Sequence, residues 1–398
     1  MGRHSDLMIS DQERGFRSID DTGICEDCIN EPGLRAFVIS NYSVYECSFC
    51  KKASTIPVAC TFDDFVTRIL EGINLEYGDP ASEGLPYESR EGGWQGNTID
   101  IYELLSELDV GDSADGLFDL VAQSIDQDLW CERDPYSLRP HQTMSYGWEA
   151  FCQFIINRSR YLFFLATNAD YDPHQHDEMN PVDILDKLGE VVKQLNLIEK
   201  LAIDTPIHRV RIVKPEVMLT NAAELGAPPN DFCVLSNRMS PAGISMFYGA
   251  FDVQTAIDET FSQQDDKRHA ISGQFYPTRE LLVLNLAGFI ELPSIFEVEK
   301  SEARRVAPFL IRFIEDFTKP IERNQRANID YVPTQVVTEY FRHIFEVNGE
   351  KLDAIKYPSS KNGKEAIVVF ADSRNCADEG HENRNTLLKL TQTSTHKL

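Results

Sequence analysis

The sequence contains no long apolar run. A helix that crosses a bilayer needs about 20 consecutive apolar residues, and the longest apolar stretch with helical character, Tyr161–Ala166, is far shorter. Arg158 and Arg160 come directly before it. The first residues of the chain also lack the apolar core of a secretory signal peptide. These absences predict a cytoplasmic protein that has no membrane partner.

Positive charge is scarce as well. The chain of 398 residues has 38 Lys and Arg against 64 Asp and Glu, which gives a net charge of −26. A surface of this sign repels the phosphate backbone of nucleic acids, so general nucleic-acid binding is disfavoured. A local basic pocket stays open. Neither a phosphate-binding P-loop nor the glycine-rich dinucleotide fingerprint is present.

The cysteines do not describe a disulfide framework, because their number is nine and no signal peptide precedes them. Four form two pairs with the spacing C-x2-C-x18-C-x2-C: Cys25, Cys28, Cys47 and Cys50. Two such turns can place four thiolates around a tetrahedral ion, so we predict a structural zinc site. The alternative is two coincidental pairs in a reduced segment. The other cysteines are expected to be small core residues: Cys60, Cys131, Cys152, Cys233 and Cys376.

Hydrophobic periodicity predicts an α+β protein with several parts. Residues 22–55 are expected to form a zinc knuckle, with a short strand at Leu34–Ile39. Residues 56–203 have a helical pattern and are expected to form a helical domain. Residues 204–372 alternate short strands with helices, and residues 373–398 are polar and predicted to be a disordered tail.

Four residues in the C-terminal half have the order and spacing of a nucleotide-sugar transferase site: Arg238, Tyr248, Glu259 and Ser359. The first three lie within residues 236–259, and the fourth follows Tyr357 and Pro358. The sequence His208-Arg209-Val210-Arg211 precedes them. From about residue 207 to 372 the chain resembles the RES domain family, which is named for an Arg, a Glu and a Ser. The resemblance implies a mixed α/β domain similar to ADP-ribosyltransferases and a toxin that consumes NAD as a substrate.

The chemistry of NAD cleavage gives each residue an expected role. Positive charge develops on the ribose as nicotinamide leaves, and the carboxylate of Glu259 could stabilise it. Arginine suits the pyrophosphate, and Arg209 and Arg238 match the positions that the family uses for it. Tyr248 could stack on nicotinamide, and Ser359 could bind its amide or ribose. For each residue a purely structural role remains the alternative.

Several points stay open at this stage. Ser360 competes with Ser359 for the serine position. Arg211 shares a strand face with Arg209 and could pair with an acid instead of a ligand. His208 stands where the family commonly has an aromatic residue, so its role is not assigned. The segment Asp330–Gln335 matches a recurring part of the family and is expected to begin a helix that supports the pocket.

The N-terminal half resembles the HEPN-like domain that accompanies some RES domains. It lacks the Arg followed four to six residues later by His that HEPN ribonucleases carry, so a ribonuclease is not expected. We therefore predict an NAD glycohydrolase or phosphorylase in a toxin–antitoxin or antiphage defence setting. An antitoxin or regulatory protein and a second copy of the chain are the expected protein partners. The alternatives are an ADP-ribosyltransferase acting on a macromolecule and a non-catalytic zinc-ribbon regulatory protein.

Overall fold

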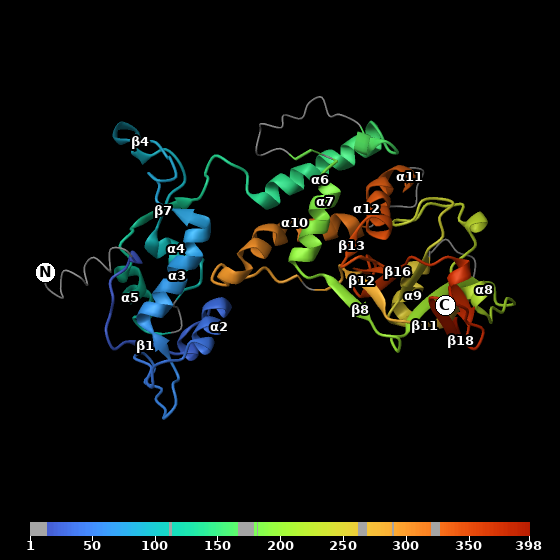
Figure 1. Ribbon diagram of the computed structural model, residues 1–398, viewed down its shortest axis with the longest axis horizontal. Coiled ribbons are helices and arrows are strands. Elements are labelled where there is room, and N and C mark those ends of the chain that lie inside the picture. The colour runs from blue at the N-terminus through green and yellow to red at the C-terminus, as the bar shows by residue number, and fades with distance from the viewer. Residues whose placement is uncertain are drawn as a thin grey trace. The chain divides into compact units, whose positions relative to one another are not determined.

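The computed structural model describes residues 14–110, 114–165, 179–180, 182–261, 269–288, 290–319 and 327–398. The chain divides into two compact units. The N-terminal unit comprises Met1–Arg139 and Glu291–Arg305, and the C-terminal unit comprises Pro140–Ile290 and Val306–Leu398. Figure 1 shows the helices and strands of both units.

The N-terminal unit is built of helices with short strands between them. Its helices are α2 (Pro32–Ser40), α3 (Phe62–Glu76), α4 (Ile101–Glu107) and α5 (Leu117–Ser124), with 3-10 turns at η1 (Glu26–Cys28), η2 (Ser89–Glu91) and η5 (Val298–Lys300). Its strands are β1 (Gly23–Ile24), β2 (Cys60–Thr61), β3 (Tyr77–Gly78), β4 (Tyr87–Glu88), β5 (Gly93–Trp94), β6 (Ile99–Asp100) and β7 (Leu129–Glu132).

Helix α3 organises the core of this unit. The Thr61 side chain caps it by accepting a hydrogen bond from the Asp64 amide, and Asp63 and Asp64 lie in the first turn, where negative charge is favourable. Its apolar residues recur at helical spacing and are fully buried, including Phe65 and Ile69. They belong to one cluster with apolar residues from α2, α4 and α5.

The C-terminal unit contains a nine-stranded sheet in the order β17-β18-β11-β9-β10-β16-β15-β12-β8. These strands are β8 (Ile198–Leu201), β9 (Ile207–Val213), β10 (Phe247–Ala250), β11 (His269–Pro277), β12 (Leu281–Asn285), β15 (Ala354–Pro358), β16 (Glu365–Val369), β17 (Cys376–Asp378) and β18 (Leu388–Lys397). The β12–β15 and β17–β18 pairs are parallel, and the other neighbours are antiparallel. A separate hairpin joins β13 (Glu346–Val347) to β14 (Glu350–Lys351).

Helices cover both faces of this sheet. The helices of the C-terminal unit are α6 (Pro140–Asn157), α7 (Ile184–Gln194), α8 (Ala222–Leu225), α9 (Val253–Thr260), α10 (Ser301–Thr318, whose first residues belong to the N-terminal unit), α11 (Ala327–Asp330) and α12 (Val332–His343). The same unit has 3-10 turns at η3 (Phe163–Leu165), η4 (Asn230–Phe232) and η6 (Ser373–Asn375). Helices α6, α7, α9, α10 and α12 share one apolar cluster with Val210 and Ile355. Helix α8 shares another cluster with Ile207 and Ile367, which alternation directs to the opposite face.

The prediction of an α+β fold is confirmed, and several details differ. Leu34–Ile39 lies in helix α2, not in a strand, because Pro32 begins the helix and the Glu31 carboxylate caps it at the Leu34 amide. The units divide after Arg139, whereas we had placed the start of the mixed domain at residue 204. Helices α6 and α7 therefore belong to the same unit as the sheet.

The prediction of a disordered tail at residues 373–398 was wrong. Strand β18 pairs with β11 over the whole of His269–Pro277, and β17 pairs with β18. Leu388 and Leu390 are buried in the cluster beneath α8. The later residues of β18 are polar, but their backbone groups complete the ladder of β11. The C-terminal segment is thus an integral part of the sheet.

Candidate active site and metal centre

Ser359 and Glu259 are in direct contact. Ser359 follows β15 at the start of the hairpin to β16, and Glu259 lies in the last turn of α9. The Ser359 hydroxyl donates a hydrogen bond to Glu259 Oε1. The Lys361 amide donates to the Ser359 oxygen at 3.2 Å, which fixes the orientation of the hydroxyl. Of the two adjacent serines, Ser359 is the one that contacts the carboxylate.

Asn362 ties this hairpin to α9. Its side-chain Nδ2 donates to Thr255 Oγ1 and to Asp258 Oδ2, each at 3.0 Å. Asp252 caps the same helix by accepting from the Thr255 amide at 2.9 Å. The contact between Ser359 and Glu259 therefore rests on a helix and a hairpin that are joined at several points.

Tyr357 lies near Glu259, and Tyr248 lies near Tyr357. The Tyr248 hydroxyl is 2.9 Å from Ser240 Oγ, and burial raises the pKa of Tyr248 to about 12. Burial, and after it the charge of Glu259, raise the pKa of Tyr357 well above its ordinary value. Arg238 and Tyr248 also act on the Tyr357 hydroxyl. Both phenols therefore stay protonated over the physiological range and can donate hydrogen bonds.

Arg238 is held by its backbone and by one side-chain contact. Its Nη1 donates to the Phe317 carbonyl at 2.8 Å. Thr334 Oγ1 donates to the Arg238 carbonyl, and Gln335 Nε2 donates to the Asn237 carbonyl at 2.8 Å. Both donors lie in the first turns of α12, so this helix supports the loop that carries Asn237 and Arg238. A supporting helix that begins within Asp330–Gln335 was predicted from the sequence.

Arg209 contacts this group of residues through a backbone atom. Its Nη1 donates to the Tyr248 carbonyl at 2.7 Å, and its guanidinium lies over the Phe247 ring, 5.3 Å from the centroid. Phe247 belongs to the cluster on the α8 face, whereas Tyr248 packs against the opposite cluster. Strands β9 and β10 are paired at one position, Ala250 with His208, so they diverge beside Arg209.

The three residues whose roles the sequence does not decide, Arg211, His208 and Ser360, have distinct surroundings. Arg211 Nη2 donates to the Gly226 carbonyl at 3.1 Å. Burial lowers the pKa of His208, although Asp252 opposes the shift, so the imidazole is neutral near pH 7. Ser360 has no hydrogen bond to Glu259 among the described residues.

Ser240, Tyr357, Asn362 and Gln335 were not singled out from the sequence as site residues. Ser240 could have been noticed because it lies two residues after Arg238. Tyr357 lies two residues before Ser359, and strand alternation directs both to one face. Asn362 and Gln335 act through contacts between segments far apart in the chain, and no local pattern points to them.

Four cysteine thiols gather in the N-terminal unit: Cys25, Cys28, Cys47 and Cys50. Their Sγ atoms all lie within 4.8 Å of one another. The Cys25–Cys28, Cys28–Cys47 and Cys25–Cys50 separations are 3.8, 3.7 and 3.4 Å. A tetrahedral ion with metal–sulfur bonds of about 2.3 Å requires sulfur–sulfur distances of about 3.8 Å. The arrangement is therefore suited to hold a metal ion.

Local backbone structure forms this cluster. Cys25 is the N-cap of η1 and Cys28 is its last residue, and Cys47–Cys50 form a turn that ends at Lys51, whose φ is 61°. Burial raises the pKa of the Cys47 thiol, but amides of Cys50 and Phe49 outweigh it and hold that pKa at about 7. Lys52 binds Glu26 at 2.7 Å and Asp27 at 2.8 Å, so it links the two turns.

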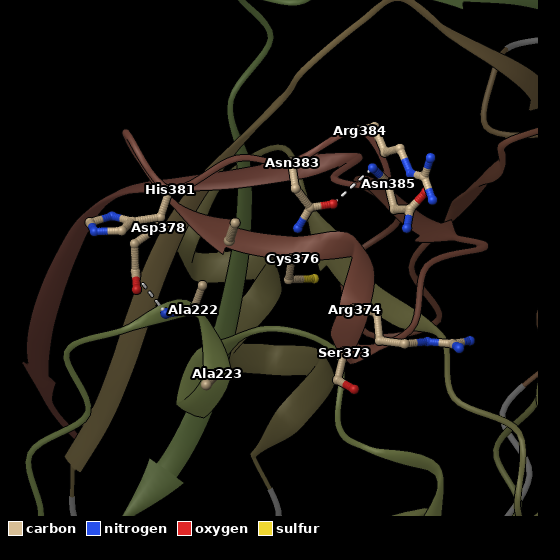
Figure 2. Close-up of a pocket in the computed structure, with 11 residues that line it drawn as sticks. Ala222, Ala223, Ser373, Arg374, Cys376, Asp378, His381, Asn383, Arg384 and Asn385 are labelled. Carbon is tan, nitrogen blue, oxygen red and sulfur yellow. Dashed lines mark hydrogen bonds between the residues drawn. The ribbon is translucent and has the colours of Figure 1, made fainter.

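A pocket of about 1000 Å³ lies elsewhere in the C-terminal unit (Figure 2). It is lined by residues of α8 and of the segment 373–385, among them Arg374, His381 and Arg384. An adjoining pocket of about 410 Å³ shares Arg374 and Arg384. None of the predicted site residues lines either pocket. The walls come largely from residues 373–385, which were predicted to be disordered, so these pockets could not be predicted from the sequence.

Comparison with protein-family models finds two matches. Residues 209–389 match the RES domain, and residues 40–169 match the HEPN/RES N-terminal domain 1. Together the matches cover most of the chain, which therefore carries a HEPN/RES N-terminal domain followed by a RES domain. A search of curated proteins and a search of solved structures found no match.

The family gives the general activity. RES domains are associated with NAD-consuming, toxin-like proteins, and the domain implies NAD binding and NAD-related enzymatic activity. The residues around Glu259 lie within the matched range. Among the described residues, no helix combines the length and apolar character that crossing a bilayer requires.

Proposed function

We propose that this protein cleaves the bond between nicotinamide and ribose in NAD and acts as a toxin in a toxin–antitoxin or defence setting. The observation that carries the proposal is the contact between Ser359 and Glu259. Around it, Arg238, Tyr248 and Tyr357 come together from separate elements of a RES domain.

Glu259 has the central role in the proposed reaction. The carbon–nitrogen bond breaks, its electron pair leaves with nicotinamide, and the ribose acquires oxocarbenium character. A fixed carboxylate next to this sugar stabilises the developing positive charge. Water then adds to the anomeric carbon and loses a proton, which gives ADP-ribose. The Ser359 hydrogen bond holds the carboxylate in a single orientation before substrate arrives.

The other residues would bind the substrate. Arg238 and Arg209 supply N–H donors for the pyrophosphate. Both are close enough to Tyr248 for their charges to act on the pKa of its hydroxyl. Tyr248 and Tyr357 offer aromatic rings with protonated hydroxyls beside Glu259, a suitable environment for nicotinamide and its ribose. The acceptor of ADP-ribose is water in the leading form of the proposal, with phosphate and a macromolecule as alternatives.

Product analysis tests the proposal directly. Purified full-length protein is incubated with NAD carrying a label in the adenylate part, with and without phosphate. Nicotinamide with free ADP-ribose supports a glycohydrolase, ADP-ribose 1″-phosphate a phosphorylase, and labelled protein or nucleic acid an ADP-ribosyltransferase. The matched control is Glu259→Gln, which preserves the shape of the side chain and removes its charge. If neither NAD cleavage nor NAD binding is detected, the non-catalytic regulatory alternative takes its place.

We also propose that the four-cysteine cluster binds one structural zinc ion. The thiolates would complete a tetrahedral shell, so no position would remain for a reactive water. The sulfur–sulfur distances of 3.4–3.8 Å support the proposal. The ion would stabilise a segment that has little apolar core of its own.

A further inference from the structure

Three neighbouring strands of the sheet are level at one of their ends. Leu388, the first residue of β18, pairs with Cys376 at the start of β17 and with Pro277 at the end of β11. An arginine lies next to each of these strand ends: Arg279 after β11, Arg374 before β17 and Arg384 before β18. The three arginines line the pocket of about 410 Å³, the arginine pocket, and no Asp or Glu is among its lining residues. In a chain with a net charge of −26, this is a local concentration of positive charge.

A tight turn before β18 holds Arg384 at the arginine pocket. The Thr386 amide donates to the Asn383 carbonyl at 3.0 Å, so Arg384 and Asn385 are the two central residues of this turn. The Asn385 amide also donates to Asn383 Oδ1 at 2.9 Å. Asn375, in the turn before β17, donates from its Nδ2 to the Asn385 carbonyl at 2.8 Å. The backbone around the arginine pocket is therefore fixed without any contribution from the Arg384 side chain.

The guanidinium of Arg384 has no hydrogen-bond or ion-pair partner among the described residues. The other two arginines are paired, Arg279 with Asp353 at 2.6 Å and Arg374 with Asp372 at 2.5 Å. In these pairs the carboxylate side chains are 14% and 18% exposed, against 53% and 83% for the arginines. The carboxylates are thus the inner partners. They orient the guanidiniums, and outward N–H donors stay available to a ligand.

The pocket of about 1000 Å³ continues from the arginine pocket, because Arg374 and Arg384 line both. Figure 2 shows these two arginines at one end of this larger pocket and His381 at the other. Small apolar and uncharged polar side chains make up most of the remaining wall, among them Ala222, Ala377, Ser373 and Asn383. Such a wall suits a base and its sugar, which need apolar contact and a few polar groups.

We propose that the two pockets together bind a nucleoside polyphosphate at a site separate from Glu259. The phosphates would lie among the three arginines, whose planar guanidiniums match phosphate oxygens, and the nucleoside would occupy the larger pocket. Ala222, in the wall of the larger pocket, belongs to the apolar cluster beneath α8. Helix α9, which carries Glu259, packs on the opposite face of the sheet. The proposal does not depend on NAD cleavage.

Calorimetric titration of the full-length protein with ATP tests the site. ATP carries three phosphates and no nicotinamide, so its binding is measured without a reaction at Glu259. We expect Arg384→Gln to weaken ATP binding about tenfold or more, because it removes charge-assisted hydrogen bonds. The variant should melt at the wild-type temperature, since the Arg384 side chain has no partner to lose. Arg312→Gln, a change at an exposed ion pair on α10, is the matched control and should bind ATP like the wild type.

Two further measurements locate the ligand and define its chemistry. Hydrogen exchange of residues 373–387 should slow when ATP is added, and Arg238→Ala should bind ATP with unchanged affinity. Adenosine and tripolyphosphate should each bind at least about tenfold more weakly than ATP, because each fills one of the two pockets. Unchanged ATP binding by Arg384→Gln, or binding that depends on Arg238 without protection of residues 373–387, would overturn the proposal. Tripolyphosphate that binds as tightly as ATP would overturn the assignment to a nucleotide.

Discussion

The metal cluster and the candidate active site are assembled in different ways. The four cysteines come from residues 25–50, and two local turns bring their thiols within 4.8 Å. Glu259 and Ser359 are 100 positions apart, and they meet because α9 packs on the sheet to which β15 and β16 belong. A site made by local turns can be read from spacing, and a site made by packing depends on the whole fold. The first should therefore fail through loss of its ion, and the second through loss of a strand or of one functional group.

The largest effect should come from removing the metal. Apparent binding free energies of structural zinc are about 10–16 kcal/mol, and in small segments this is folding free energy. Cys25→Ser and Cys47→Ser should each abolish stoichiometric zinc and raise hydrogen exchange across residues 22–60. Elemental analysis of protein purified without chelators provides the measurement. Cys60→Ser, which replaces a buried cysteine outside the cluster, should retain zinc. Zinc-free wild-type protein would refute the assignment.

Truncation after Asp372 should have a comparable effect on the C-terminal unit. It removes β18, which pairs with every residue of β11, and it uncovers the apolar surface that Leu388 and Leu390 bury. Domains are stable by only roughly 5–15 kcal/mol. Because the truncation removes both this strand pairing and this apolar burial, the unit should not fold cooperatively. Circular dichroism melting measures this, with deletion of Leu398 alone as the control. An unchanged melting temperature would show that β18 is dispensable.

A comparison of several elements with strand β18 shows why some parts of the fold can be predicted from the sequence and others cannot. The cap at Thr61, the helix α9 and the alternating strand β9 each follow from a pattern in their own residues. Strand β18 was missed because it buries apolar side chains at Leu388 and Leu390 and then continues with polar residues. The ladder of β11 holds that polar half in place, which is information that β18 itself does not carry.

The site residues divide in the same way. Arg238, Tyr248 and Glu259 lie close together in the chain, and their order could be recognised. Their meeting with Ser359 could be expected only through the family resemblance, because nothing local relates a hairpin residue to a helix end 100 positions away. The Arg209 side chain lies over the ring of Phe247. This contact could not be predicted from the sequence, because it depends on how β9 and β10 diverge after their pairing at His208 and Ala250.

Removing the carboxylate of Glu259 should be the largest effect confined to the active site. Loss of one preorganised electrostatic group typically costs about 100-fold or more in turnover. Glu259→Gln should therefore bind NAD at near wild-type affinity and cleave it at least about 100-fold more slowly. Expression of the wild-type chain should slow bacterial growth and lower cellular NAD, and expression of this variant should not. Glu190→Gln, a change at an exposed ion pair on α7, serves as the control. Equal toxicity of Glu259→Gln would contradict the assignment.

Arg238→Ala should act on binding more than on turnover. A phosphate-binding arginine contributes charge-assisted hydrogen bonds of about 1.5–3 kcal/mol, so KM for NAD should rise about tenfold or more while kcat changes less. Steady-state kinetics separates the two parameters. Arg312→Ala removes an exposed arginine that pairs with Glu149 and should leave both parameters unchanged. An unchanged affinity of Arg238→Ala for NAD would assign Arg238 to structural support of the loop through Phe317.

The smallest effect, and the sharpest test of a site made by packing, distinguishes Ser359 from Ser360. The two serines are adjacent, yet it is the Ser359 hydroxyl that donates to Glu259. The Lys361 amide, which donates to the same hydroxyl oxygen, holds it in this orientation. A hydrogen bond to a charged group contributes about 1.5–3 kcal/mol, and part of this should appear in the transition state, when the orientation of Glu259 matters most. Ser359→Ala should therefore lower kcat about tenfold, with little change in melting temperature. Ser360→Ala should have activity close to wild type. If the two variants lose activity equally, the contact seen between Ser359 and Glu259 does not orient the carboxylate for catalysis.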